Sequence, residues 1–321
     1  MGSFSFTLAK AVFRNWLSKT ILREKIPGAI HIEVTSQCQF NCPGCYVPQN
    51  SESIWDIHKL SQLVNEAETL GIRQFTFTGG EPFLFPELIL ETASKHQSSA
   101  FFVVTNGLAL DDRLCGKIAK RQNVAVIVSH DGAKSDVYRN EGAKKVAEEA
   151  LEMLCKHKVF TCSSTRVSKE TYDDVICRRF FKKLSETGVS CAIFAPLLPG
   201  KEGMTALDDE QRSGLPKLVS ELGRVTEIHA VVPCGKGEKS CAGGALVLAF
   251  SPQGAALPCP HIRSSTHRWP ETSLQEILES SYFRDIAKSR TPLSCGRSCL
   301  VLDPAEELER IVACHCARFP Q

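Results

Sequence analysis

The sequence predicts an α/β fold with a parallel sheet, followed by a smaller region rich in cysteine. From residue 29 to residue 197, short runs of β-branched and aromatic residues alternate with stretches of helical spacing. Strands separated by helices imply right-handed crossovers and a parallel sheet. After about residue 205 the alternation stops, and glycine, proline and cysteine become frequent. Periodicity leaves open whether the sheet closes into a barrel.

Six segments have the composition of strands. They are AIHIEV from Ala29, QFTFT from Gln74, FFVVT from Phe101, VAVIVS from Val124, VFTCSSTRV from Val159 and CAIFAPL from Cys191. The segments between them have helical spacing: apolar residues recur from Leu60 to Leu70 before Gly71, and Pro86 begins the helical segment PELILETASKH. This part of the chain therefore contains six β-α units.

Unusual sequences follow five of these strands. The cysteine loop from Cys38 to Cys45 follows the first, GGEP the second, TNG the third, SHDG the fourth and LLPG the sixth. Ligands of parallel α/β folds bind at the carboxyl ends of the strands, so we expect these loops to line one cavity.

Three regions are expected: residues 1–27, a core over 28–205, and a cysteine-rich region over 206–321 with helices near 207–222 and 273–288. The first 27 residues form a basic amphipathic segment with no acid before Glu24. It is expected to be a helix packed on the body or a tail of uncertain order, with a membrane-surface contact through residues 4–23 or a transit segment as the alternative. The last region is too rich in loops to be held by apolar burial alone, which favours metal coordination.

Composition indicates a folded globular protein. Of the 321 residues 43% are hydrophobic and 23% charged, and the net charge is +2. These values exclude a disordered chain and give no sign of a nucleic-acid partner. No apolar run reaches the ~18 residues of a spanning helix, and a secretory signal is not evident. A cytoplasmic protein, with membrane contact through residues 4–23 as the alternative, is expected.

The fifteen cysteines favour metal binding over disulfides, because their number is odd and no secretion signal precedes them. Cys38, Cys42 and Cys45 place three thiolates within eight residues. Three thiolates suit three corners of an iron–sulfur cubane and leave one iron open, whereas structural zinc is the alternative. Five scattered cysteines are interpreted as small buried apolar residues. They are Cys115, Cys155, Cys162, Cys177 and Cys191.

The cysteine loop resembles that of the radical S-adenosylmethionine (radical SAM) enzymes, in which CxxxCxxC precedes an aromatic residue, here Tyr46. The segment Gly79-Gly80-Glu81-Pro82 resembles the family's segment that holds the methionine ammonium group. Glycines allow close backbone approach, and a carboxylate accepts hydrogen bonds from an ammonium. The resemblance implies a (β/α)6 partial TIM-type barrel, a 4Fe-4S cluster on the three cysteines, and bound S-adenosylmethionine.

The resemblance also suggests polar residues near the cofactor. Asn106 and Ser129 are candidates for the nucleoside, with helix caps or turns as the alternative. Arg166 is a candidate for the cofactor carboxylate, with a surface ion pair as the alternative. His130 is either a substrate contact or, preferably, a structural histidine.

The last third carries a second resemblance, to the SPASM and twitch extensions that bind auxiliary iron–sulfur clusters. It rests on Cys241-x12-Gly254-x4-Cys259, with VLAF as a strand and Ser251 to Gly254 as the turn of a hairpin. Cys295 and Cys299 would complete one auxiliary 4Fe-4S site. Spare donors for a second cluster are Cys234, Cys314, Cys316, His261 and His315. Zinc is the alternative here too.

The resemblance implies an enzyme that cleaves S-adenosylmethionine reductively to a 5′-deoxyadenosyl radical, which takes a hydrogen atom from a C–H bond. The basic N-terminus favours a small-molecule or amphiphilic substrate, such as a lipid, isoprenoid or tetrapyrrole. A peptide-modifying maturase is the alternative within the family, and a non-catalytic iron–sulfur or zinc protein is the alternative outside it. A reducing partner such as flavodoxin or ferredoxin is expected.

Overall fold

The computed structural model describes residues 27–43, 45–48, 53, 55–198, 204–233, 247–288 and 305–316. Nine strands form one sheet in the order β7-β6-β5-β4-β3-β2-β1-β8-β9. All neighbours are parallel except β8 and β9. The strands are β1 (Ala29–Thr35), β2 (Gln74–Gly79), β3 (Ala100–Thr105), β4 (Val124–Ser129), β5 (Phe160–Val167), β6 (Cys191–Pro196), β7 (His229–Val231), β8 (Val247–Phe250) and β9 (Ala256–Leu257).

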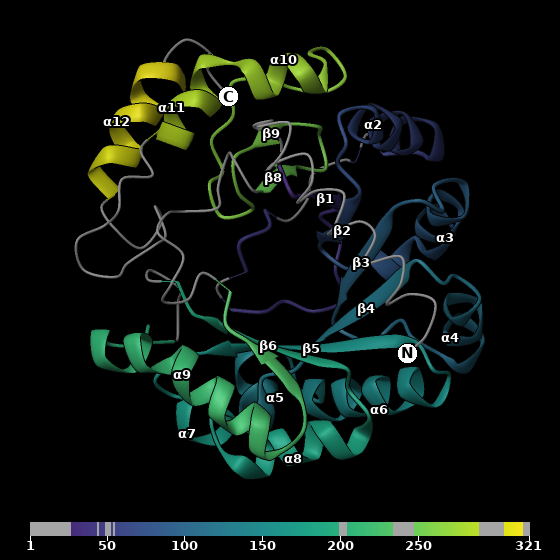
Figure 1. Cartoon of the computed structure of the whole chain (residues 1–321), viewed down its shortest axis with the longest axis vertical. Helices are drawn as coiled ribbons and strands as arrows, with labels where there is room; N and C mark the ends of the chain where they lie inside the picture. Colours follow the sequence, from purple (N-terminus) through teal and green to yellow (C-terminus); the bar gives the residue numbers. More distant parts are fainter. Residues whose placement is uncertain are drawn as a thin grey trace.

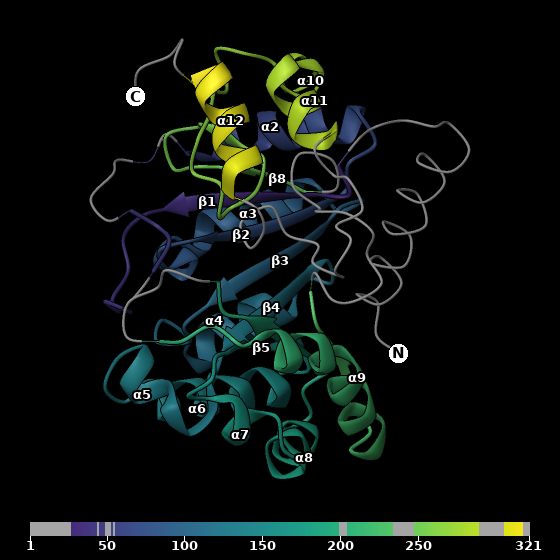
Figure 2. The ribbon, with the colours of Figure 1, turned by 90° about the vertical axis from the view of Figure 1, so that its left-hand side faces the viewer.

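The sheet curves into a partial barrel with its helices on the outside, as Figures 1 and 2 show. The described helices are α2 (Ile57–Thr69), η1 (Pro82–Leu84), α3 (Pro86–Lys95), α4 (Asp112–Ala119), η2 (Gly132–Lys134), α5 (Ser135–Tyr138), α6 (Ala143–Lys156), α7 (Tyr172–Val175), α8 (Arg178–Thr187), α9 (Asp209–Val225), α10 (Leu274–Glu279), α11 (Ser281–Lys288) and α12 (Ala305–Cys316). No helix among the described residues has the length and apolar character needed to cross a bilayer.

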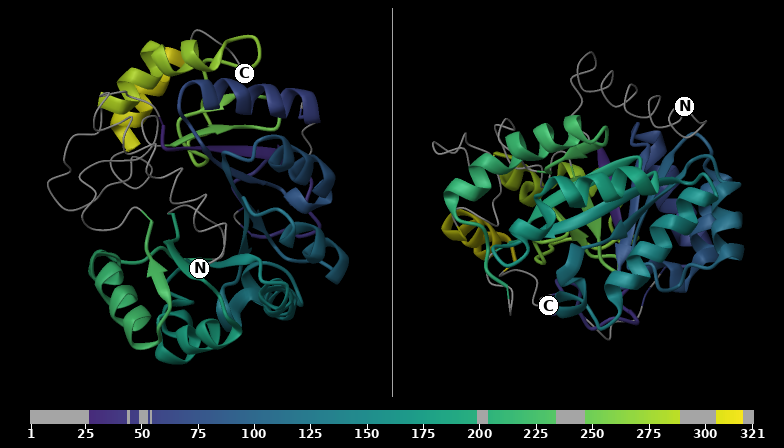
Figure 3. Two further views of the ribbon diagram at one scale, coloured as in Figure 1. Left: turned by 45° about the vertical axis from the view of Figure 1, so that its right-hand side comes forward. Right: turned by 90° about the horizontal axis from the view of Figure 1, so that it is seen from below.

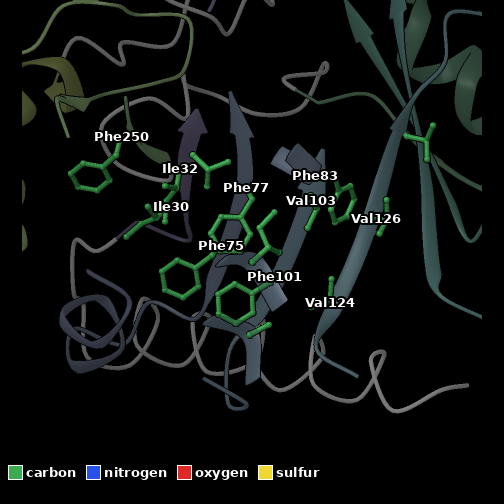
Figure 4. Close-up of a cluster of buried hydrophobic side chains, with 14 of the residues drawn as sticks. Ile30, Ile32, Phe75, Phe77, Phe83, Phe101, Val103, Val124, Val126 and Phe250 are labelled. Carbon is green, nitrogen blue, oxygen red and sulfur yellow. The ribbon is translucent and has the colours of Figure 1, made fainter. Parts of the chain in front are cut away.

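Alternate residues of each strand face the helices and build the core. Figure 4 shows Phe75, Phe77 and Phe101 packed together, with the stacked rings of Phe77 and Phe101 5.6 Å apart. Because side chains alternate along a strand, the remaining residues face the inside of the barrel. The inner residues near the carboxyl ends of the strands are therefore placed to form a site.

The six expected strands and the parallel sheet are confirmed. The hairpin is also confirmed: β8 and β9 are antiparallel, and the Gly254 amide donates to the Ser251 carbonyl at 2.9 Å. The helical stretch near 207–222 is α9, whereas that near 273–288 is two helices, α10 and α11, separated by the extended Ser280. Helix α12 was not predicted.

The chain after residue 205 contributes more to the sheet than the sequence suggests. β7 extends it beyond β6, and β8 pairs with β1 at the other end. Strands this short carry too little pattern to reveal their partners. Figure 3 shows α2 beside the hairpin and α10, and the Glu66 carboxylate of α2 accepts a hydrogen bond from Trp269 at 3.2 Å. The boundaries at residues 27–28 and 205–206 stay predictions, and residues 1–26 lie outside the described residues.

The scattered cysteines are not all buried. Cys115 and Cys162 are buried as expected, but Cys155, Cys177 and Cys191 are only partly buried. Full burial is therefore wrong for these three, although Cys155 and Cys177 still pack against the hydrophobic core.

Candidate functional site

A cavity of about 310 Å³ lies at the carboxyl ends of the strands. The core residues predicted from the sequence all line it, and they come from the loops after β1, β2 and β3 and from the ends of β4 and β5. They are Cys38, Cys42, Cys45, Tyr46, Gly79, Gly80, Glu81, Asn106, Ser129 and Arg166. The fold therefore brings together residues that are up to 128 positions apart (166 − 38) in the sequence.

The cysteine loop is held against the turn that follows β2. The Gly80 amide donates to the Thr35 carbonyl at 2.7 Å, and the Glu81 amide donates to the Gln37 carbonyl at 2.8 Å. A Cβ on Gly80 would lie 2.0 Å from the Gln37 oxygen, and Gly79 has φ +112. Only glycine fits at these two positions, which fixes where the loop carrying Cys38 begins.

Glu81 is a fully buried carboxylate with three donors around it. Oε1 accepts from the Phe83 amide at 3.0 Å and the Thr105 hydroxyl at 2.8 Å, and Oε2 accepts from the Asn106 amide at 2.8 Å. Burial raises its pKa, and these donors oppose the rise. A carboxylate offers about four acceptor positions, so one remains for a ligand in the cavity.

The thiols of the loop lie close enough to influence one another. Burial raises the pKa of Cys38 and of Cys42, and the nearby Cys45 raises both further. The Phe40 amide, which donates to the Cys38 sulfur at 3.4 Å, opposes this rise. Cys38 and Cys42 are partly buried and Cys45 is exposed. Three neighbouring thiolates repel one another, so a positively charged iron centre would stabilise all three.

Asn106 links the cysteine loop to the turn after β3. Its Nδ2 lies 3.6 Å from the Cys38 sulfur and donates to Gln39 Oε1 at 3.4 Å. Its Oδ1 accepts from the Leu108 amide at 2.8 Å, which is the turn interaction considered as the alternative. Asn106 therefore supports the turn and also faces the cavity.

Arg166 belongs to an ion cluster that the sequence does not reveal. Its Nε donates to Asp131 Oδ2 at 3.0 Å, and Arg139 donates to the same carboxylate at 2.7 and 3.0 Å. Asp131 is fully buried, and both arginines line the cavity. One carboxylate shared by two guanidiniums leaves a net positive charge, and both arginines lower the pKa of Cys42 against the effect of burial.

Arg139 was missed in the sequence because the four-residue helix α5 carries no recognisable motif. The sequence shows only that Arg139 follows Asp131 by eight residues, which by itself does not indicate an ion pair. Arg166 forms an ion pair, which was the alternative to a role in binding the cofactor carboxylate. The pair is partly buried, and Arg166 also lines the cavity.

A segment from the last third of the chain also reaches the cavity. The rings of His261 and Tyr46 meet edge to face with centroids 4.8 Å apart. Arg263 anchors this segment through two hydrogen bonds, of 2.5 and 3.1 Å, to the fully buried Glu33 of β1. Burial raises the pKa of Tyr46, whose hydroxyl lies 3.3 Å from the Thr78 hydroxyl. From the sequence, His261 was expected only as a metal ligand, and neither Glu33 nor Arg263 was predicted.

His130 lies away from the cavity, on the helix-facing side of the sheet. Its ring packs on Phe180 at 5.3 Å, and its Nε2 lies 3.9 Å from Glu148 Oε1. Burial lowers its pKa to about 4, which outweighs the opposite effect of Glu148. It is therefore a neutral structural histidine, as preferred from the sequence.

The cysteines assigned to an auxiliary cluster are only partly described. Cys259 lies in a tight turn in which the Ile262 amide donates to the Cys259 carbonyl at 3.0 Å. Cys234, Cys241, Cys295 and Cys299 lie outside the described residues. Within the described ranges, no three His, Cys, Asp or Glu side chains converge on a point where one metal ion would sit. A cubane does not need such a common point, because each of its thiolates binds a different iron atom.

Comparison with known proteins identifies the family. The model of the radical SAM superfamily matches residues 32–176, from β1 to the end of α7. Residues 32–176 therefore form a radical SAM domain. Enzymes of this superfamily use a 4Fe-4S cluster and S-adenosylmethionine, and both are cofactors of this chain. The three thiols, the glycine turn and the remaining acceptor of Glu81 fit these two groups.

Relatives of this radical SAM chain act on different substrates. PqqA peptide cyclase of Ruegeria pomeroyi is 25% identical over 288 residues, which span 78% of this chain and 73% of that protein. GTP 3′,8-cyclase of Clostridium botulinum is 24% identical over 196 residues, 56% of this chain and 59% of that protein. Streptococcus suis SuiB bound to precursor peptide SuiA has a TM-score of 0.72 at 13% identity over 87% of this chain and 71% of SuiB. The SuiB comparison shows a shared fold.

The glycine turn of this radical SAM core makes a stability prediction. Gly80→Ala forces the new Cβ against the Gln37 carbonyl and weakens two hydrogen bonds. The free energy of unfolding in urea should fall by about 1–3 kcal/mol. Gly214→Ala in α9 is the control, because its Cβ meets nothing within 4 Å. Equal unfolding free energies for the two variants would contradict the packing described here.

His130 makes a prediction about pH. The folded protein keeps the ring neutral down to about pH 4, whereas the unfolded chain takes up the proton near pH 6.5. Between these values the unfolded state binds more protons, so stability falls as pH decreases. His130→Gln should remove up to about 3 kcal/mol of that dependence. Urea unfolding of both proteins between pH 7 and 4 measures it, and parallel curves would refute the assignment. The charged groups facing His130 are Glu148, Asp131, Lys183 and Arg139.

Proposed function

We propose that this chain is a radical SAM enzyme that modifies a peptide. The sequence favours a small-molecule or amphiphilic substrate, but the comparisons support the peptide alternative better. A peptide cyclase matches 78% of the chain, whereas the GTP cyclase matches 56%. The fold shared with SuiB, which was solved with its precursor peptide SuiA bound, also supports a peptide substrate.

The cluster ligands in this proposal are Cys38, Cys42 and Cys45. The observation that carries the proposal is that all three line one cavity together with the Gly79–Glu81 turn, which is hydrogen-bonded to their loop. When bound, the cluster and S-adenosylmethionine together supply hydrogen-atom abstraction from an unreactive C–H bond. The net positive Asp131 cluster beside Cys42 offsets part of the negative charge of the thiolates.

The S-adenosylmethionine ligands in this proposal surround the same cavity. The remaining acceptor position of Glu81 and the close backbone of Gly79 and Gly80 receive the ammonium group. Arg166 and Arg139 direct their charge toward the carboxylate, each already oriented by Asp131. Residues near the nucleoside are Asn106, Ser129 and Tyr46.

Six apolar residues from the cysteine loop, from β3 and from the end of β6 also line the cavity. They are Phe40, Val47, Val104, Pro196, Leu197 and Leu198. Apolar walls exclude water and competing hydrogen donors from the place where substrate and cofactor meet. They also suit an apolar side chain of a peptide better than a charged one.

We further propose one auxiliary 4Fe-4S cluster on Cys241, Cys259, Cys295 and Cys299. The position of the Cys259 turn supports it, since His261 two residues later already lines the cavity. A flavodoxin or ferredoxin would supply electrons.

Cofactor cleavage tests the proposed function. Anaerobically reconstituted protein given dithionite and S-adenosylmethionine should release 5′-deoxyadenosine, measured by liquid chromatography. Cys38→Ala should abolish this release, because only Cys42 and Cys45 would remain and three thiolates are needed to hold the cluster. Cys155→Ala, a partly buried cysteine outside the cavity, should keep it. No 5′-deoxyadenosine from the iron-loaded wild-type chain would instead indicate an electron carrier.

Iron analysis tests the auxiliary site. Removing Cys241 and Cys259 together should lower the iron content by about one cubane, four irons per chain, and leave measurable 5′-deoxyadenosine release. The double variant keeps the three cysteines assigned to the first cluster. Iron content equal to that of the wild type would show that these two cysteines bind no cluster.

A further inference from the structure

Two cysteines that the proposed chemistry does not use meet on neighbouring strands. Cys162 of β5 pairs in register with Cys191, the first residue of β6. Residues paired in register on adjacent strands point to the same face of a sheet. The two thiols also influence each other's pKa, as expected of neighbours on one face. The fold therefore places side by side two cysteines that lie 29 residues apart (191 − 162) in the sequence.

The thiols face the inside of the barrel. Ser164 follows Cys162 by two residues and lines the cavity, and Ala195 follows Cys191 by four residues and also lines it. Phe194, next to Ala195 in β6, points to the opposite face and stacks on Phe181 of α8, with the ring centroids 4.6 Å apart. By this alternation the cysteine pair lies on the inner face, nearer the amino ends of the strands than the cavity.

The two thiols differ in access and in proton affinity. Cys162 is 4% exposed, whereas Cys191 is only partly buried. The neighbouring Cys162 thiol lowers the pKa of Cys191, and Cys191, together with burial, raises the pKa of Cys162. The thiolate is the nucleophile in disulfide exchange, so Cys191 is the attacking sulfur and Cys162 the second one.

The strand spacing permits a bond between them. Neighbouring strands lie about 4.8 Å apart, and disulfides join Cα atoms at roughly 4.4–6.8 Å. A bridge between strands paired in register leaves little freedom to relax, and constrained disulfides are the more easily reduced ones. These features fit a reversible bond better than a permanent one.

We propose that Cys162 and Cys191 form a redox-active dithiol that a small-molecule disulfide converts to an intramolecular disulfide. With oxidised glutathione, the Cys191 thiolate attacks one sulfur and releases one glutathione thiolate. The Cys162 sulfur then loses its proton to solvent, attacks the Cys191 sulfur and releases the second glutathione. The cysteine pair loses two electrons, and the glutathione disulfide gains them.

Peptide mapping of the full chain tests this proposal without any cofactor or substrate. Wild-type protein and three serine variants, of Cys162, Cys191 and Cys155, are incubated with oxidised glutathione. Remaining thiols are then alkylated in denaturant, and the peptides are identified by mass spectrometry. Circular dichroism before incubation checks that each variant is folded. Wild type should give a peptide pair linked through Cys162 and Cys191, which dithiothreitol removes.

The variants separate the two roles. Cys162→Ser should accumulate glutathione on Cys191, because the second attack is lost, and Cys191→Ser should leave Cys162 as an alkylated thiol. Cys155→Ser, which alters a cysteine outside the pair, should still give the linked peptides. The proposal is overturned if Cys162 and Cys191 of the wild type are both recovered as alkylated thiols, or if Cys191 carries glutathione and no peptide linked to Cys162 is found. The wild-type result alone decides this if a variant does not fold.

Discussion

The site depends on the close contact between the ends of the first two strands. Two backbone hydrogen bonds, from Gly80 to Thr35 and from Glu81 to Gln37, join the start of the cysteine loop to the glycine turn. Neither glycine has room for a side chain. This contact fixes the start of the loop that carries Cys38 and the position of Glu81. The same stretch of paired backbone therefore positions the thiols and the carboxylate that line the cavity.

Charge around the cavity is arranged so that buried ions are shared. Asp131 is surrounded by Arg139 and Arg166, and Glu33 is paired with Arg263. Buried charges are costly unless paired and hydrogen-bonded. The Asp131 cluster and the Glu33–Arg263 pair both satisfy that condition. The first orients Arg139 and Arg166, which line the cavity, and the second holds the segment that carries His261.

Much of the site was predictable, because it is carried by residues next to strand ends. The CxxxCxxC spacing, the glycine turn, Asn106 and Ser129 follow strands whose alternation is clear in the sequence. Arg139, Glu33 and Arg263 were not predictable, because their importance comes from contacts between distant elements. Glu33 looks like an ordinary polar residue in a strand until Arg263, 230 residues later, pairs with it. The same holds for β7 and β8, whose few residues do not specify their neighbours.

The pairing of β8 with β1 has a consequence for synthesis of the chain. β1 ends at Thr35, but the strand that covers its outer edge begins only at Val247. During translation the core β-α units can assemble while this edge of the first strand still exposes unpaired amides and carbonyls. The nascent protein therefore exposes this strand edge until Val247 to Phe250 have been synthesised, and early release would leave the edge free to pair with strands of other chains.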